Sequence, residues 1–304
     1  MSSETGPGLQ VLWATDGSEG ARSAVPVLRQ IVLPVTKRLV VLVVAPRPLL
    51  SSARPDPARL KLIKRDTRAN LLAEAQALAN EEARYLGAEA IQVDTIARLG
   101  SPIQEILREA RRLRADLVVL GAKGHSNIGL LLLGSVSQGV VQHATQPILI
   151  ARPGHENVRR IQLAYDATPP ANQAATFLQK LALPSDAVIS VARVVEPFIV
   201  PSSTPWAYRM RAFAAAEEIN HRLHRAAERS LRDAATRLKA SGRAIETEML
   251  TGAPGEELLR VIKQNQVDLT VVGSRKPSAL RHYLLGSTAE KLVRHADTSV
   301  LVVR

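Results

Sequence analysis

The chain has 304 residues, of which 46% are hydrophobic and only 3% aromatic, and it contains no cysteine. This length allows two ordinary domains with their own cores, and the lack of cysteine excludes a disulfide scaffold, a thiolate metal site and a cysteine nucleophile. The formal charge of +12 would suit nucleic acid or an acidic membrane. Because the arginines are scattered and aromatic rings are scarce, we interpret it as a solvated basic surface that favours anionic ligands.

The first half of the sequence alternates strands and helices with short connections. Bare apolar runs such as 39–45 are typical of strands buried on both faces of a parallel sheet. Ser18 and Ser101 stand where helix caps are expected, and Pro102 follows at a favoured first helical position. The order βαβαβαβαβ predicts a parallel sheet with helices on both faces. The predicted strands are 9–15, 39–45, 90–97, 117–120 and 147–151, and the predicted helices are 18–33, 58–86, 101–113 and 135–143.

The second half repeats the first at a nearly constant offset. Asp166 follows Asp16 by 150 residues, and Val194 follows Val44 by the same distance. From Gly252 onward the offset is 152, which predicts a net insertion of two residues in the loop 197–205. The polar segment 153–158 reads as a linker. We therefore predict two tandem domains, residues 1–153 and 158–304.

The stretch from Asp116 to Arg152 has the arrangement that holds phosphate: a buried strand, a glycine loop and a helix N-terminus. Gly121 ends the strand, Gly124 lies in the loop, and Gly134 precedes Ser135 at the start of the helix. Glycines let backbone N–H groups turn toward an anion and approach it closely. Ser135 is a candidate cap for the helix. Each charge-assisted bond of this kind contributes about 1.5–3 kcal/mol, so a few suffice to hold a nucleotide.

The spacing G-x2-G-x9-G-S, the Asp-Gly-Ser after the first strand and the ending HATQPILIARP resemble the universal stress protein family. The resemblance covers nearly the whole chain, twice over. It implies two doubly wound parallel five-stranded α/β sheets with strand order 3-2-1-4-5, similar to adenine nucleotide alpha hydrolases and related by a pseudo-twofold axis. It also implies an ATP site in the crevice where the strand order reverses, between the first and fourth strands.

The resemblance further implies a role for particular residues, with ATP as the cofactor and magnesium as its counter-ion. The aspartate lies near the adenine or ribose, the valine at the end of the second strand packs on the base, and backbone amides of the glycine loop and helix start hold the phosphates. The residues that match these roles are Asp16, Val44, Gly121, Lys123, Gly124, Gly134, Ser135 and Val136.

Each assignment has a structural alternative. Asp16 could only close a turn with Gly17, as turn aspartates commonly do. Gly134 could only relieve packing between loop and helix. A solvated Lys123 is about as well supported as one that pairs with phosphate. We favour ligand contact for Asp16 and Gly134 because of their positions.

The matching site of the second half departs from the pattern. Ala167 and Thr168 replace Gly-Ser, and Lys276 stands where the second glycine should be. A lysine in a left-handed backbone costs only about 1–2 kcal/mol, so its side chain in phosphate space is the larger obstacle. We expect this degenerate site to bind weakly or not at all. Its residues are Asp166, Val194, Gly273, Lys276, Gly286 and Ser287.

The sequence supports binding better than catalysis. It contains no GxxxxGK[ST] loop and no obvious acidic pair for magnesium, so we assign no catalytic residue and no protein-held metal. We expect an ATP-binding stress-response or signalling protein with little or no turnover. The alternatives are a pseudo-dimeric scaffold in which nucleotide is secondary, a slow ATPase, and an adenylyltransferase. The last is the least supported, because this sequence lacks the SGGxDS-type loop that such enzymes have after the first strand.

Partners and location follow from the same features. We expect the closing strands, 147–151 and 300–304, to pair within the chain as an intramolecular pseudo-dimer, with pairing of two chains as a homodimer left open. The N-terminal segment lacks the pattern of a signal peptide, and no apolar run is long enough to span a membrane. We therefore expect a cytoplasmic protein with an unidentified protein partner and neither a membrane nor nucleic acid.

Overall fold

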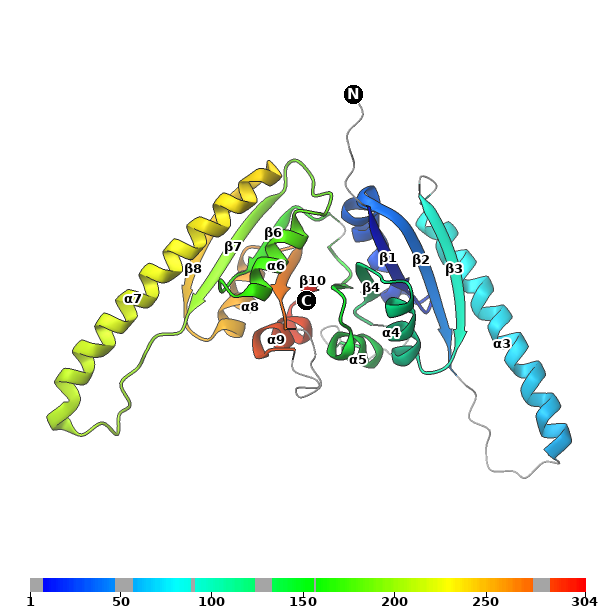
Figure 1. The fold of residues 1–304 in the computed structure, drawn as a ribbon, viewed down its shortest axis with the longest axis horizontal. Coiled ribbons are helices and arrows are strands. Elements are labelled where there is room, and N and C mark those ends of the chain that lie inside the picture. The colour runs from blue at the N-terminus through cyan, green and yellow to red at the C-terminus, as the bar shows by residue number, and fades with distance from the viewer. Residues whose placement is uncertain (1–7, 47–56, 89–90, 124–132, 156, 276–284) are drawn as a thin grey trace. The chain divides into compact units, whose positions relative to one another are not determined.

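A computed structural model describes residues 8–46, 57–88, 91–123, 133–155, 157–275 and 285–304. The chain divides into two compact units. Unit 1 comprises residues 1–157 and 276–285, and unit 2 comprises residues 158–275 and 286–304. Each unit contains one set of alternating strands and helices, shown in Figure 1.

The sheet of unit 1 has five parallel strands in the order β3-β2-β1-β4-β5, which confirms the predicted 3-2-1-4-5 topology. The middle strands are buried because helices cover both faces of the sheet. Strand bounds are β1 Leu9–Ala14, β2 Thr36–Ala45, β3 Gln92–Leu99, β4 Leu117–Gly121 and β5 Ile148–Ala151.

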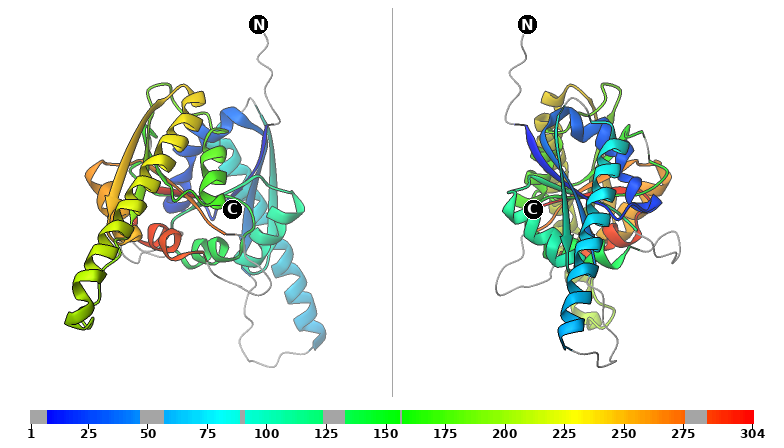
Figure 2. Two further views of the ribbon diagram at one scale, coloured as in Figure 1. Left: turned by 60° about the vertical axis from the view of Figure 1, so that its left-hand side comes forward. Right: turned by 90° about the vertical axis from the view of Figure 1, so that its right-hand side faces the viewer.

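The helices of unit 1 lie on both faces, as predicted. The long helix α3 packs against β2 and β3 and faces the viewer in the right-hand view of Figure 2. Helices α4 and α5 pack against each other, and α4 also contacts β2. Helix bounds are α1 Glu19–Arg22, α2 Ala24–Val27, α3 Pro57–Leu86, α4 Pro102–Arg112 and α5 Ser135–His143.

The helix predicted after the first strand of unit 1 is not continuous in the structure. We predicted a single helix over 18–33, but the structure has α1, α2, a π-helical turn over Leu28–Val32 and a 3-10 turn over Leu33–Val35. Pro26 lies inside the predicted helix and Pro34 directly follows it, and proline removes a backbone donor and clashes with the preceding turn. The predicted cap is confirmed, because the Ser18 hydroxyl accepts a hydrogen bond from the Ala21 N–H at 3.1 Å.

Unit 2 repeats this architecture with the order β10-β9-β6-β7-β8, again all parallel. Helix α7 packs against β7 and β8, as α3 does against β2 and β3. Strand bounds are β6 Arg160–Ala164, β7 Val188–Val195, β8 Ala244–Thr251, β9 Leu269–Gly273 and β10 Ser299–Val303. Helix bounds are α6 Pro169–Leu178, α7 Trp206–Leu238, α8 Pro254–Gln264 and α9 Ser287–His295, with a 3-10 turn over Lys239–Ser241.

Two further expectations concern the whole chain. The pairing of the two closing strands with each other stays a prediction. Among the described residues, none of the helices combines the length and the apolar character needed to cross a bilayer.

Candidate functional site

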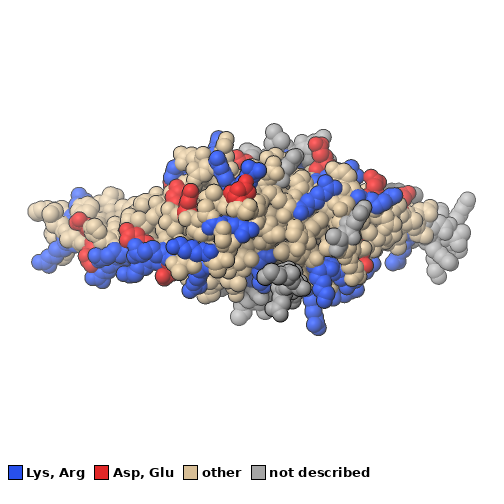
Figure 3. Space-filling view, turned by 90° about the horizontal axis from the view of Figure 1, so that it is seen from above, with Lys and Arg blue, Asp and Glu red and all other residues tan. Residues whose placement is uncertain are grey.

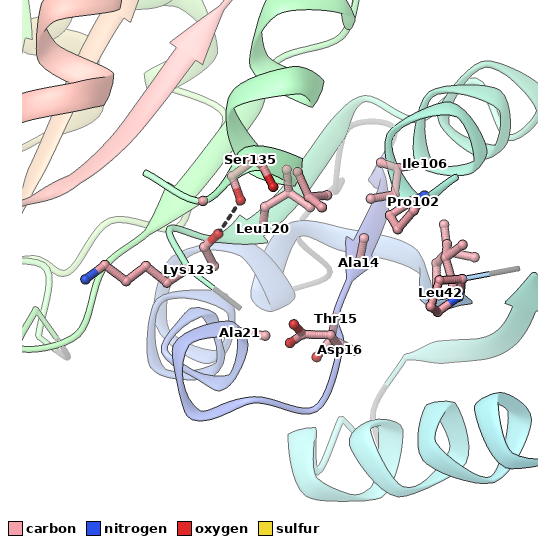
Figure 4. A pocket seen from close by; sticks show the side chains of 16 residues that line it. Ala14, Thr15, Asp16, Ala21, Leu42, Pro102, Ile106, Leu120, Lys123 and Ser135 are labelled. Atoms are coloured by element: carbon pink, nitrogen blue, oxygen red, sulfur yellow. Dashed lines mark hydrogen bonds between the residues drawn. The ribbon is translucent and has the colours of Figure 1, made fainter. Parts of the chain in front are cut away.

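A cavity of about 320 Å³ opens in unit 1 where β1 and β4 lie side by side and the strand order reverses. This is the position at which doubly wound sheets bind ligands. Seven of the eight predicted site residues line the cavity, and the eighth, Gly124, lies outside the described residues. In Figure 4, Asp16 and Ser135 stand on opposite walls. The predicted residues that line it are Asp16, Val44, Gly121, Lys123, Gly134, Ser135 and Val136.

The N-terminus of α5 forms one wall. The first intrahelical bond of the helix runs from Gln138 N–H to Gly134 O at 2.9 Å. The N–H groups of Ser135, Val136 and Ser137 therefore precede the helical hydrogen-bonding pattern and lie beside the cavity. Such amides, together with the helix dipole, favour an anion at this point.

Two details of this wall differ from the prediction. Ser135 does not cap α5: it is the first helical residue, Gly134 is the N-cap, and no side chain caps the helix. The Gly134 N–H is not available to a phosphate either, because it donates to Ala122 O at 2.8 Å. Gly134 has a φ of −65°, so its backbone does not require glycine. The amides that could meet an anion are those one to three residues further along.

Asp16 closes a turn and also lines the cavity. Its Oδ1 accepts from the Ser18 N–H at 3.1 Å and from the Ser18 hydroxyl at 2.5 Å. The structural alternative for this residue is therefore present in the molecule. Asp166 makes the same turn in unit 2, where Thr168 donates from N–H at 3.0 Å and from the hydroxyl at 2.6 Å. The turn is therefore enough to explain why both units have an aspartate at this position. Contact between Asp16 and a ligand needs separate support.

Gly121 is required by packing. A Cβ at this position would lie 2.1 Å from Gly20 O and 2.6 Å from Ala21 Cα, which are backbone atoms at the start of α1. The matching Gly273 is equally confined, with Pro170 C at 2.3 Å. Both glycines let the helix that follows the first strand approach the fourth strand. Their presence therefore does not by itself indicate a ligand.

Lys123 contributes less to the cavity than its position in the sequence suggests. It lies on the rim and is half-buried. In Figure 4 its ammonium end points away from the other labelled side chains. A direct contact between this ammonium group and a ligand would need another rotamer.

Several lining residues were not predicted. Ser137 is buried, and its hydroxyl donates to Gly121 O at 2.7 Å, which ties the start of α5 to the end of β4. Leu42 and Leu120 lie within two residues of Val44 and Gly121, so the sequence positions of these two strand ends could have predicted them. Pro102 and Ile106 come from the start of α4, which the glycine spacing does not mark. The remaining apolar lining residues are Ala14, Ala21, Pro46, Pro102 and Ile106.

A buried carboxylate supports the cavity from the side of α3. Glu82 is fully buried, accepts from Arg22 Nε at 2.8 Å and lies 3.3 Å from the Thr15 hydroxyl. The hydrogen bond to Glu82 raises the pKa of Arg22 above its ordinary value. The Thr15 hydroxyl also accepts from the Gly17 N–H at 3.1 Å. This network fixes the turn that presents Asp16.

In unit 2 the matching residues occupy the same strand and helix ends but differ in character. Glu196 stands at the position of Pro46, so an exposed carboxylate directly follows β7 where unit 1 has a proline after β2. Gly286 precedes α9 with a φ of 89°, unlike Gly134. Lys276 lies outside the described residues. The residues at the matching places are Asp166 after β6, Val194 in β7, Gly273 at the end of β9, and Gly286 and Ser287 at the start of α9.

Comparison with known proteins agrees with this duplication. A family model described as the universal stress protein family matches residues 9–152 and again residues 157–304. A universal stress protein of Methanocaldococcus jannaschii is 28% identical over 158 residues, which cover 51% of this chain and 87% of that protein. Another, from a Synechocystis species, is 22% identical over 190 residues, covering 62% of this chain but only 58% of that protein.

The fold is also found among solved structures. The crystal structure of a universal stress protein from Archaeoglobus fulgidus superposes with a TM-score of 0.62 at 20% identity, covering 97% of this chain and 98% of that one. At this identity the likeness concerns the fold. The family model, in contrast, covers nearly the whole sequence in two copies. The chain belongs to the universal stress protein family.

Proposed function

We propose that unit 1 binds an adenine nucleotide, ATP in the first instance, and that the chain acts as a nucleotide-responsive stress or signalling protein. The observation that carries this proposal is the pairing of two chemistries in one cavity. Leu42, Val44 and Ile106 provide an apolar side that suits a base, and the first amides of α5 provide an anion-binding side. Asp16 stands on the wall opposite Ser135, where a ribose hydroxyl could donate to its carboxylate.

We propose binding without rapid turnover. Phosphoryl transfer needs a held metal, a positioned nucleophile and charge stabilisation at the transferred group. In the part of the chain that the structure describes, there is no group of three or more His, Asp or Glu side chains that could hold a metal ion. Magnesium would then arrive with the nucleotide, as the counter-ion of its phosphates. An assay for ADP and AMP under multiple-turnover conditions checks this point, and rapid release of either would favour the enzyme alternatives.

We also propose that unit 2 binds nucleotide more weakly than unit 1. The carboxylate of Glu196 after β7 would repel phosphate, whereas Pro46 carries no charge. The changed backbone at Gly286 alters how the chain enters α9. The change at Gly286 lies on the side that matches the phosphate wall of unit 1, and Glu196 adds its negative charge directly after β7, on the side that matches Val44 and Pro46.

The experiment that tests the proposal is calorimetric titration of ATP into Ser135→Asp and Ser287→Asp. Both serines are exposed first residues of a helix, where an acidic side chain favours the helix dipole. Both variants should therefore fold normally. We expect ATP affinity to fall at least tenfold in Ser135→Asp and to stay unchanged in Ser287→Asp. Unchanged affinity in a folded Ser135→Asp would contradict the assignment of the α5 amides.

A further inference from the structure

The aromatic residues of this chain are few, and a large share of them lie exposed in one short stretch. The sequence has three Phe, two Trp and four Tyr. Within residues 198–213 the exposed fractions are 50% for Phe198, 83% for Trp206, 66% for Tyr208 and 52% for Phe213. Ile199 and Met210 in the same stretch are 75% and 77% exposed. We call these six side chains the apolar tip.

The apolar tip lies on the first turns of α7 and on the loop directly before the helix. The helix is anchored to the sheet by its later turns, through buried residues such as Ala227, Leu231 and Leu238. None of its first ten residues, 206–215, is buried. Figures 1 and 2 show this end of α7 extending past the ends of β7 and β8. Exposed apolar patches of this kind commonly mark an interaction site.

The loop before α7 is held against the helix in a defined way. The Asn220 amide accepts from the Phe198 N–H at 2.7 Å and donates to Phe198 O at 3.1 Å. Arg209 donates to Ser202 O at 3.0 Å and to Thr204 O at 3.3 Å. These bonds keep Phe198 and Ile199 beside Phe213, around an open groove of about 580 Å³. The apolar side chains are therefore presented together.

The charge of α7 as a whole is positive, and the arginine excess lies along residues 222–237, since the turns next to the apolar tip carry Arg209 and Arg211 against Glu217 and Glu218. Helix α7 carries seven arginines against three glutamates and one aspartate. Arg222 pairs with Glu218 at 2.7 Å, whereas Arg209 donates to backbone carbonyls, and neither Arg209 nor Arg211 forms an ion pair with a described residue. In Figure 3, basic side chains gather over the end of unit 2 that carries α7. The complementary partner is therefore an anionic surface.

We propose that the apolar tip and the arginines of α7 form a docking surface for an anionic lipid bilayer. Trp and Tyr favour the headgroup level of a membrane, and arginine forms paired hydrogen bonds with phosphate. Exposed aromatic side chains next to basic ones are the pattern of helices that lie on a membrane surface. The helix would rest on the bilayer without crossing it, which agrees with the lack of a membrane-spanning helix among the described residues.

Vesicle flotation with the full chain tests the proposal. The probes are vesicles of phosphatidylcholine alone and of phosphatidylcholine with an equal part of phosphatidylglycerol. We expect the protein to float with the second kind at low salt, to be released by high salt, and to ignore the first kind. Trp13 is fully buried, so a blue shift of tryptophan emission on binding should report Trp206 and should vanish in Trp206→Phe.

Two variants separate this surface from the general charge of the chain. Trp206→Ser with Phe213→Ser should weaken vesicle binding at least tenfold, and so should Arg209→Gln with Arg211→Gln. The control is Lys180→Gln with Lys263→Gln, which removes the same charge from exposed sites elsewhere in unit 2 and should change binding little. Circular dichroism checks that each variant is folded.

Three outcomes would overturn the proposal. The first is no flotation with anionic vesicles at low salt. The second is equal binding by the wild type, the tip variants and the control, which would attribute binding to net charge. The third is self-association that Trp206→Ser abolishes while vesicle binding persists, which would make a second copy of this chain the occupant.

Discussion

Unit 1 and unit 2 share a sheet topology, but at matching buried positions one unit has charged or polar side chains where the other has apolar ones. In unit 1, Glu109 is buried and accepts from Arg98 at 2.8 Å and from Arg112 at 2.6 Å. Burial alone would raise the pKa of Glu109, but the two arginines lower it below its ordinary value. Unit 2 has no such ion cluster at these places. The matching residues there are Val261, Leu250 and Gln264.

The reverse exchange occurs at the other end of the strands. In unit 2, Gln162 lies beside Ser190 and Thr270 in register across three strands. Gln162 and Thr270 are fully buried, and none of their side-chain polar atoms has a hydrogen-bond partner among the described residues. In unit 1 the same row is apolar, and its members are Leu12, Val40 and Val118.

A third exchange concerns size. On α5, Gly139 leaves room for Ile103 of α4, since a Cβ at Gly139 would lie 2.4 Å from Ile103 Cδ1. In unit 2 the small residue is on the other helix, where Gly255 of α8 lies under Lys291 of α9. The two units therefore keep the same contacts between elements. The small and the large residue of a contact can be exchanged between the two elements that form it. Features that stay the same in both units are therefore best explained by the fold, and features that differ can serve function.

The largest expected effect concerns a feature that the units share. Gly121→Ala and Gly273→Ala should each destabilise their unit by about 3 kcal/mol or more, because the new Cβ would meet backbone that cannot move aside. Denaturant unfolding monitored by circular dichroism measures this. A Gly121→Ala protein of normal stability that fails to bind ATP would show that the glycine serves the ligand.

The next effect concerns a feature that only unit 1 has. Glu109→Gln should cost about 3 kcal/mol at neutral pH, because it leaves two arginines facing a neutral group. The folded-state pKa of Glu109 is lowered, so its contribution to stability is present above the unfolded pKa of about 4.3 and is lost as pH falls below it. The difference between wild type and variant should therefore shrink in acid. A difference that is constant with pH would contradict this account.

Unit 2 should gain stability from the residues of unit 1. Gln162→Leu with Thr270→Val should stabilise unit 2 by about 2 kcal/mol, because it removes buried polar atoms without partners. Leu12→Gln in unit 1 is the matched reverse change and should destabilise. Guanidinium unfolding curves of the three proteins provide the measurement. Loss of stability in the double variant would mean that these groups have partners in solution.

The smallest effect concerns the turn after the first strand. Ala167 adopts a φ of 64°, the conformation that Gly17 adopts at 74° in unit 1. Ala167→Gly should therefore stabilise unit 2 by about 1 kcal/mol. Gly17→Ala should destabilise unit 1, since its Cβ would also lie 2.8 Å from Leu78 Cδ1. Thermal unfolding detects both, and the same sign for both changes would refute the equivalence of the two turns.

Apolar runs and turn residues were enough to predict much of this fold. Helix α5 has the predicted bounds, because a Gly-Ser boundary is a local signal. The segment 18–33 was predicted as one helix from its Ser18 cap, but Pro26 lies inside it and the structure divides it. For the site, the end of β4 and the start of α5 were predictable from their spacing.

Contacts between distant segments were not predictable from those patterns. Nothing local shows that Gly121 faces Gly20, that Gly134 donates to Ala122 O, or that Ser137 donates to Gly121 O. These contacts depend on how closely two elements approach in the folded chain. The role of α4 in lining the cavity was missed for the same reason, because Pro102 and Ile106 belong to an ordinary amphipathic helix.

The central claim is that one unit, and not both, has kept the nucleotide site. Native mass spectrometry of the intact chain in excess ATP counts bound nucleotides directly. The account predicts one nucleotide per chain. Two nucleotides per chain, or none, would contradict it.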